Sequence, residues 1–140
     1  AVCVVTRVTL LLVLGSSVSR GSQTAKADVT SLGSIQALTN DNIEVIKLSS
    51  DAHASGFVIF IRNSVRQHRH NQHSETILVL EGNASMTLND KEFEVNPGDY
   101  VHIPQGALHS VTRVLSEQPL KVLSLQAPEF VGKDREFVEP

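Results

Sequence analysis

The chain has 140 residues, with 12 basic and 15 acidic side chains and a net charge of −3 at neutral pH. This acidic balance argues against nucleic-acid binding, which requires a basic face. The single cysteine, Cys3, excludes a framework of internal disulfides.

The first 27 residues have the pattern of a secretory leader. Two apolar runs are separated by Arg7, and Ser, Gly and Thr become frequent after them. Ala25-Lys26-Ala27 has the small-x-small form that signal peptidase reads, and the apolar run is too short for a transmembrane span. We therefore expect a signal peptide over residues 1–27 and an exported protein, periplasmic or secreted, that begins at Asp28 and has no membrane contact after cleavage. A non-cleaved, disordered or misread leader is the alternative.

Removal of that leader leaves 113 residues, 28–140, a length that suits one domain rather than two. All 15 acidic residues remain but only nine basic ones, so the net charge becomes −6. This strengthens the case against a nucleic-acid partner. Cys3 falls within the leader, so the exported domain has to rely on its core and on any bound metal for stability.

The rest of the chain has the periodicity of β-strands. Its segments alternate apolar with polar residues or are short aliphatic runs, and a weak helix at 30–38 is the one exception. Glu81-Gly82-Asn83 is a turn signal, and Asn89-Asp90-Lys91 predicts a tight hairpin. Eight short strands at close spacing predict an all-β sandwich or barrel. The predicted strands are 43–48, 57–61, 76–80, 84–88, 92–95, 100–103, 109–115 and 120–125.

Metal-type ligands gather in the segment HRHNQHSE, which runs from His68 to Glu75. His68 and His70 are two residues apart, so on a strand both rings leave the same face. Glu75 opens the next apolar run, and His109 ends the segment GDYVHIPQGALH. Three imidazoles and one carboxylate, without thiolates, suit one divalent transition metal ion (Fe, Mn, Zn, Ni, Cu or Co) rather than an iron–sulfur cluster.

The same residues resemble the two sequence motifs of the cupin superfamily. The first motif is His-x-His, four residues, Glu, six residues and Gly82. The second is Gly98, five residues, Pro-x-Gly, two residues and His109. The resemblance covers about residues 43–125 as a single cupin domain. It implies a cupin-type antiparallel β-barrel, also called a double-stranded β-helix or jelly roll, with a metal inside. The implied metal ligands are His68, His70, Glu75 and His109.

Two positions depart from the family pattern. Arg62 stands where a glycine is expected, and Arg113 stands where an asparagine is expected. Neither is a ligand, so the departures bear on the substrate and not on the metal. If the strand after His109 is regular, Arg113 shares the face of His109 near the barrel mouth and could clamp a carboxylate or phosphate. A surface arginine paired with Glu117 or Glu81 is the alternative.

Three side chains are candidate catalytic groups: Arg113, Tyr100 and His73. The spacing of His73 from the preceding histidine also suits a metal. We expect it instead in the connection between two strands, either solvated or hydrogen-bonded to a group outside the ligand set. His102 is expected on a solvated strand face and His53 in a loop.

The function that follows is a metalloenzyme acting on a small organic molecule. Glu75, Ile77 and Val79 share one strand face, which predicts a mostly apolar cavity beside the metal. The resemblance implies dioxygenases, decarboxylases, isomerases and epimerases, and no residue selects among them. A non-catalytic ligand-binding or sensing module and an interaction protein with a degenerate site are the alternatives. The tail, residues 127–140, could cover a barrel end or form a homodimer contact.

Overall fold

The structure is a computed structural model that describes residues 29–138, so the predicted leader and its cleavage site lie outside the described residues. Residues from Ser31 onward belong to one compact unit. Within residues 29–138 no helix has the length and apolarity needed to span a bilayer. The elements are η1 (Leu32–Ser34), β1 (Ile43–Ser50), β2 (Ser55–Ile61), β3 (Val65–His70), β4 (Ser74–Glu81), β5 (Ala84–Leu88), β6 (Lys91–Val95), β7 (Tyr100–Ile103), β8 (His109–Val114), β9 (Leu120–Ala127) and β10 (Arg135–Phe137).

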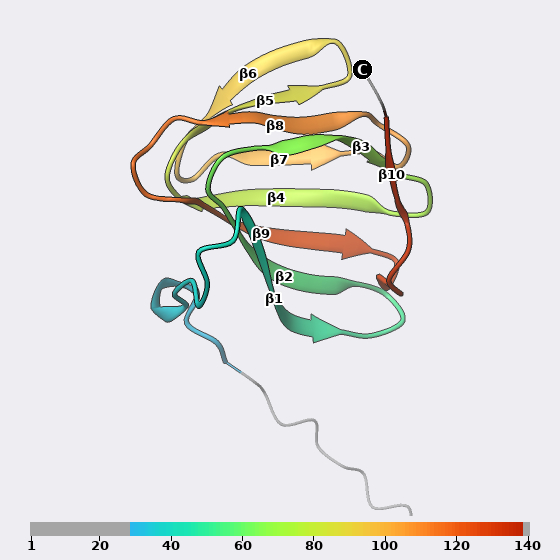
Figure 1. Ribbon diagram of the computed structural model, residues 1–140. Helices are drawn as coiled ribbons and strands as arrows, with labels where there is room; N and C mark the ends of the chain where they lie inside the picture. Colours follow the sequence, from blue (N-terminus) through green and yellow to red (C-terminus); the bar gives the residue numbers. More distant parts are fainter. Residues whose placement is uncertain (1–28, 139–140) are drawn as a thin grey trace, which may run out of the picture. The chain divides into compact units, whose positions relative to one another are not determined.

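The strands form two five-stranded antiparallel sheets that face each other (Figure 1). The first sheet has the order β1-β2-β9-β4-β7 and the second the order β10-β3-β8-β5-β6. Each sheet contains one hairpin of consecutive strands, β1-β2 or β5-β6, and its other neighbours are distant in sequence, as in a jelly roll. The prediction of an all-β, double-stranded β-helix fold is confirmed, and all eight predicted strands form. β3 and β10 are additional strands.

The predicted weak helix at 30–38 is wrong. Only the single 3-10 turn η1 forms there, and the residues on both sides of it, Ser31 and Ile35, are extended. Gly33 lies in the middle of this segment, and a glycine destabilises a helix interior by about 1 kcal/mol relative to alanine. The segment also lacks a strong apolar stripe whose packing could offset this destabilisation.

The predicted turns form and set the register of the second sheet. Leu88 pairs with Lys91, so Asn89 and Asp90 make a two-residue hairpin loop, and Asn89 has a positive φ of 52°. Asparagine tolerates that conformation well. Gly82 ends β4 with a φ of 75°, and a Cβ atom there would lie 2.7 Å from the carbonyl oxygen of Pro119. Glycine is therefore required at this corner.

The hydrophobic core fills the space between the two sheets. Apart from Ala107, which lies between β7 and β8, its members come from the strands, where successive side chains point to opposite faces. They are Ile61, Ile77, Val79, Ala84, Met86, Val95, Val101, Ile103, Ala107, Val111, Leu120 and Val122.

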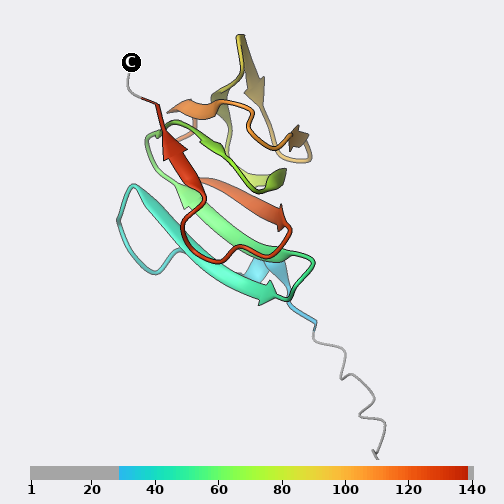
Figure 2. The same ribbon diagram turned by 90° about the vertical axis from the view of Figure 1, so that its right-hand side faces the viewer.

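The C-terminal segment links the two sheets. β9 lies in the first sheet, whereas β10 is an edge strand of the second sheet and pairs with β3. Figure 2 shows the segment between β9 and β10 passing from one sheet to the other at one end of the strands. The tail thus covers a barrel end, which is one of the two positions expected for it.

Candidate metal centre

The four predicted ligands come together from both sheets. His68 and His70 lie on β3, and His68 faces His109, the first residue of β8, in direct register. Glu75 belongs to β4 in the opposite sheet. All four side chains are buried. The site therefore lies between the sheets, at the end where β10 closes over them.

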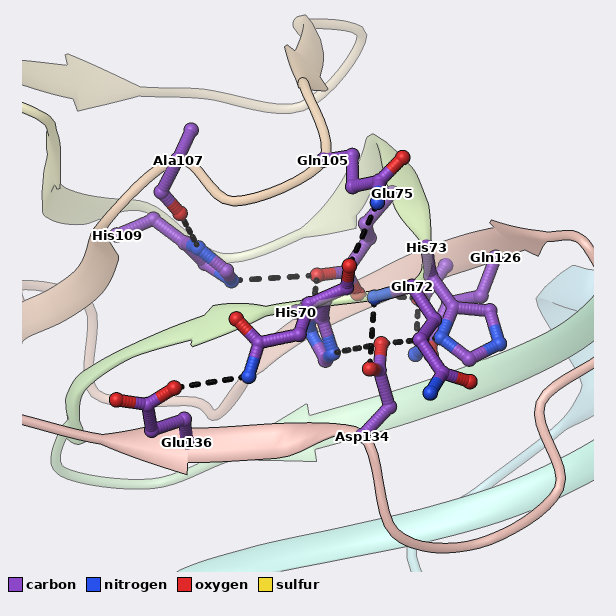
Figure 3. Close-up of polar contacts among 12 residues, drawn as sticks. His70, Gln72, His73, Glu75, Gln105, Ala107, His109, Gln126, Asp134 and Glu136 are labelled. Carbon is purple, nitrogen blue, oxygen red and sulfur yellow. Dashed lines mark hydrogen bonds and ion pairs between the residues drawn. The ribbon is translucent and has the colours of Figure 1, made fainter.

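The donor atoms lie close enough together to share one ion. Ligand atoms of His68, His70 and His109 are all within 4.8 Å of one another. Oε2 of Glu75 is 3.4 Å from Nε2 of His70 and 3.4 Å from Nε2 of His109. Figure 3 shows the Glu75 carboxylate between these two imidazoles. Donors bound to one ion at about 2.1 Å lie about 3.0–3.4 Å apart.

Backbone carbonyls orient two of the rings. Nδ1 of His68 is 2.8 Å from the carbonyl oxygen of Arg66, and Nδ1 of His109 is 3.0 Å from that of Ala107. A carbonyl only accepts hydrogen bonds, so both Nδ1 atoms carry the proton. When such a ring is neutral, its lone pair is on Nε2, the atom that His109 directs toward Glu75. This tautomer is the one that ligates a metal through Nε2.

The surroundings of His68 and Glu75 favour the protonation states that metal binding requires. Burial, together with the charges of His109, His70 and Arg135, lowers the pKa of His68 to about 4. Burial acts to raise the pKa of Glu75, but His109, His70 and Ser124 outweigh it and lower that pKa well below its usual range. At neutral pH the site thus presents a neutral imidazole at His68 and a carboxylate at Glu75.

An unpaired buried atom supports the fit to a metal. Nε2 of His109 has no hydrogen-bond partner among the described residues, although the side chain is 4% exposed. Buried polar atoms are almost always paired, and the binding of an ion is one of the few reasons for an exception. Three converging imidazoles and a carboxylate suit divalent transition metals. The residues present therefore fit a metal ion.

His73 is not solvated, contrary to one of the two positions expected for it. It lies in the predicted connection between β3 and β4 but is only 2% exposed. Its Nδ1 donates to Asp134, and its Nε2 donates to the carbonyl oxygen of Glu129 at 2.8 Å. Burial acts to lower the pKa of His73, but these two acceptors raise it overall. With both ring nitrogens facing acceptors, His73 is an imidazolium.

Asp134 lies between His70 and His73 (Figure 3). Its Oδ1 accepts from the backbone N–H of Gln72 at 2.8 Å, and its Oδ2 is 3.7 Å from Nδ1 of His70. His70, His73 and Asp134 form a second group whose ligand atoms lie within 4.8 Å. Because both nitrogens of His73 are already hydrogen-bonded, the group of His68, His70 and His109 is the better metal site.

The structure places Arg113 and Tyr100 away from the cavity. Ser85 pairs with Arg113 and the next residue, Met86, pairs with Val111, so β8 carries a bulge at Thr112. The extra residue interrupts the alternation, and Arg113 is exposed on the outside. The conditional prediction that Arg113 shares the face of His109 is therefore wrong, and Arg113 has the surface position of the alternative. Glu81, one alternative partner, pairs with Lys121 instead.

Tyr100 is 67% exposed and lines a separate depression with Phe93 and His102. The exposed positions expected for His102 and His53 are confirmed.

A cavity opens beside the four ligand residues. Its volume is about 60 Å³. Apart from those ligands, its polar lining residues are Ser110, Gln126 and Arg135. The predicted apolar face of Glu75, Ile77 and Val79 is buried as expected. The aliphatic lining residues are Ile43, Val45, Ile59, Ile61, Val65, Ile77, Met86, Val111 and Val122.

Four residues of the site have no signal in the sequence that singles them out. Ser124 donates to Oε1 of Glu75 at 2.5 Å, and Gln126 donates to Ser124 at 3.4 Å. Both point inward from β9, and strand alternation from the core residue Val122 would have placed them there. Asp134 and Arg135 reach the site only because the chain returns to pair with β3, which no spacing indicates.

Comparison with known proteins identifies the family. The cupin domain profile matches residues 62–126. An uncharacterized protein of Aquifex aeolicus is 36% identical over 99 residues, which are 71% of this chain and 80% of that protein. The chain belongs to the cupin superfamily, as its motifs predict. A double-stranded β-helix protein of Klebsiella pneumoniae has the same fold, with a TM-score of 0.69 at 16% identity, over 82% of this chain and 100% of that one.

One relative has a named activity. Quercetin 2,3-dioxygenase of Bacillus subtilis is 42% identical over 43 residues. Those residues are 31% of this chain but only 13% of the dioxygenase. The similarity is thus confined to a short part of a much longer enzyme.

Proposed function

We propose that this cupin binds one divalent transition metal ion through His68, His70, Glu75 and His109 and is an enzyme acting on a small organic molecule. The observation that carries the proposal is the buried, unpaired Nε2 of His109 facing the Glu75 carboxylate between the sheets. The donor set accepts iron, manganese, zinc, nickel, copper or cobalt.

A bound ion with an open position would supply Lewis-acid or redox chemistry. The residues of the chain have supporting tasks. The carbonyls of Arg66 and Ala107 hold two imidazoles in their ligating orientation. Ser124 holds the Glu75 carboxylate. The aliphatic wall of the cavity excludes water from a bound molecule, which strengthens electrostatic interactions there.

Among dioxygenase, decarboxylase and isomerase reactions, the dioxygenase type has the most support. The supporting observation is the similarity to part of quercetin 2,3-dioxygenase. The test is an oxygen-electrode screen of phenols and small organic acids with protein loaded separately with Fe²⁺, Mn²⁺, Cu²⁺ and Ni²⁺. We expect oxygen uptake that requires the metal and is lost in His109→Ala. Metal-loaded protein that consumes no oxygen but converts an acid or sugar would favour a decarboxylase or isomerase.

A non-catalytic ligand-binding or sensing module is the second candidate. The observation that favours it is the cavity lining: outside the four ligand residues, the described lining has no carboxylate or imidazole to act as a general base. The test is whether protein with a full equivalent of metal binds a small molecule saturably but does not convert it. That result would support a binding or sensing module over an enzyme.

We also propose that residues 1–27 are a signal peptide and that the protein is exported. The support is the sequence pattern of this segment. N-terminal sequencing of the exported fraction should begin at Asp28. Recovery of Ala1 from that fraction would refute cleavage at this position.

A further inference from the structure

We infer that the cavity takes a small organic acid, whose carboxylate is bound by Arg135 of the C-terminal strand. This inference rests on the proposed function, because it names the substrate class of the same site.

The pairing of β10 with β3 directs Arg135 toward the cavity. Arg135 lies opposite His70 in register, whereas the next residue, Glu136, lies opposite Arg69. Because side chains alternate along a strand, Arg135 shares the face of the ligand histidines. Arg69 and Glu136 form an ion pair of 2.7 Å on the other face. Arg135 itself is among the residues that line the cavity.

Arg135 is an exposed residue, and within residues 29–138 its guanidinium forms no hydrogen bond or ion pair with another side chain. It is the only permanently charged cation among the described cavity-lining residues. The cavity carboxylate, Glu75, already interacts with Ser124 and the histidines. A carboxylate from outside would bind Arg135 with two parallel hydrogen bonds.

Gln126 is a second polar side chain of the cavity to which the acid can bind. It is 3% exposed and lines the cavity. Ser124 gives its only proton to Glu75, so its oxygen accepts from Nε2 of Gln126. This orients the amide and leaves Oε1 of Gln126 buried without a hydrogen bond to any residue in the described range 29–138. A hydroxyl or amino group on the acid would supply the missing donor.

Size and polarity favour a short monocarboxylate. The cavity of about 60 Å³ has room for roughly four to six water sites at ~10–15 Å³ each. The rest of its lining is aliphatic apart from Ser110 and the ligand residues. A phosphate dianion carries more negative charge than one guanidinium neutralises, whereas a branched aliphatic monocarboxylate matches both the charge and the wall.

The test compares isobutyrate with isobutyramide, which has nearly the same shape but no charge. Binding to the full chain is measured by NMR titration, with zinc and after chelation, in the parent and in Arg135→Gln, Arg135→Lys and Arg113→Gln. Arg113 is the matched control, since it is an exposed arginine outside the cavity. We expect Arg135→Gln to weaken isobutyrate binding by roughly 10- to 100-fold and to leave isobutyramide binding unchanged. Arg135→Lys should retain part of the preference, and Arg113→Gln all of it.

An equal loss in Arg113→Gln, or no loss in Arg135→Gln, would overturn the inference, as would tighter binding of inorganic phosphate than of isobutyrate. A further arm compares 2-hydroxyisobutyrate with isobutyrate after chelation. The hydroxyl should tighten binding in the parent and not in Gln126→Leu. Metal content is measured separately, so an Arg135-dependent preference without stoichiometric metal would contradict the proposed function alone.

Discussion

Asp134 and His73 form a buried ion pair that joins the C-terminal segment to the connection between β3 and β4. The Asp134 carboxylate accepts from Nδ1 of His73 and from the backbone N–H of Gln72, and it faces Nδ1 of His70 at 3.7 Å. At that distance the carboxylate interacts with the His70 imidazole without a hydrogen bond, and Nδ1 of His70 has no hydrogen-bond partner within residues 29–138. The segment beyond β9 is thus part of the support of the candidate metal centre.

This relationship predicts different effects for the two neighbouring histidines. His73→Gln should preserve metal stoichiometry and reduce metal affinity by no more than about 10–100-fold, the usual cost of losing an outer partner. His68→Gln should weaken binding much more, because it removes a ligand. Metal titration of both variants by calorimetry checks the prediction. An empty site in His73→Gln together with a filled site in His68→Gln would mean that the wrong histidine has been chosen.

Metal removal should lower the thermal stability. A metal held at a thousand times its dissociation constant adds about 4 kcal/mol to the free energy of unfolding, which raises Tm by roughly 10 °C or more for a chain of this size. The measurement is a calorimetric scan of metal-loaded and chelator-treated protein, with His109→Ala as the control that should not respond. Identical Tm values for the loaded and stripped parent would contradict stabilisation by a bound metal.

Gly82→Ala should destabilise the fold. The positive φ alone costs about 1–2 kcal/mol for an L-residue, and the added Cβ would also lie 2.7 Å from the carbonyl oxygen of Pro119. Gly98→Ala is the matched control, because Gly98 has a positive φ but open space around its Cβ position. Urea unfolding should show a larger loss for Gly82→Ala. Equal losses would mean that the contact with Pro119 relaxes freely.

Glu44 should make stability depend on pH below its usual pKa. Its carboxylate accepts from the backbone N–H groups of Leu38 and Thr39 at 2.9 and 3.0 Å. In the folded protein these backbone hydrogen bonds lower the pKa of Glu44 below its ordinary value of 4.5. The stabilisation is therefore present above pH 4.5 and is lost as the pH falls through the lowered pKa.

The check is the free energy of unfolding of the parent and of Glu44→Gln between pH 7 and pH 3. The parent should be more stable at pH 7, and the difference should shrink toward zero at the acidic end. A difference that is constant over this range would assign the effect to something other than the charge.

The elements with strong local signals could be predicted from the sequence. Asn89 and Gly82 mark turns because few residues adopt their backbone conformations. The aliphatic runs mark the strands that supply the core. β3 has the composition VRQHRH, which lacks an apolar alternation, so only the spacing of its two histidines indicated an extended segment. β10 is three residues long and has no pattern of its own.

Only the part of the site that belongs to the two sequence motifs could be predicted. The spacing from His68 to His109 identifies the four ligand positions, which the fold brings together. Asp134 is 61 residues from His73, and no sequence pattern relates the two. Arg113 was placed on the wrong face because a bulge at Thr112, which carries no residue-level signal, interrupts the strand.

The metal content of the purified protein tests the central claim most directly. Full-length protein prepared without chelator, and without an affinity tag that carries nickel, is analysed by mass spectrometry for all first-row transition metals. His109→Ala is compared with His102→Ala, because His102 is an exposed histidine outside the candidate centre. The account predicts one equivalent of metal in the parent and in His102→Ala and almost none in His109→Ala. Equal metal content in all three proteins would contradict it.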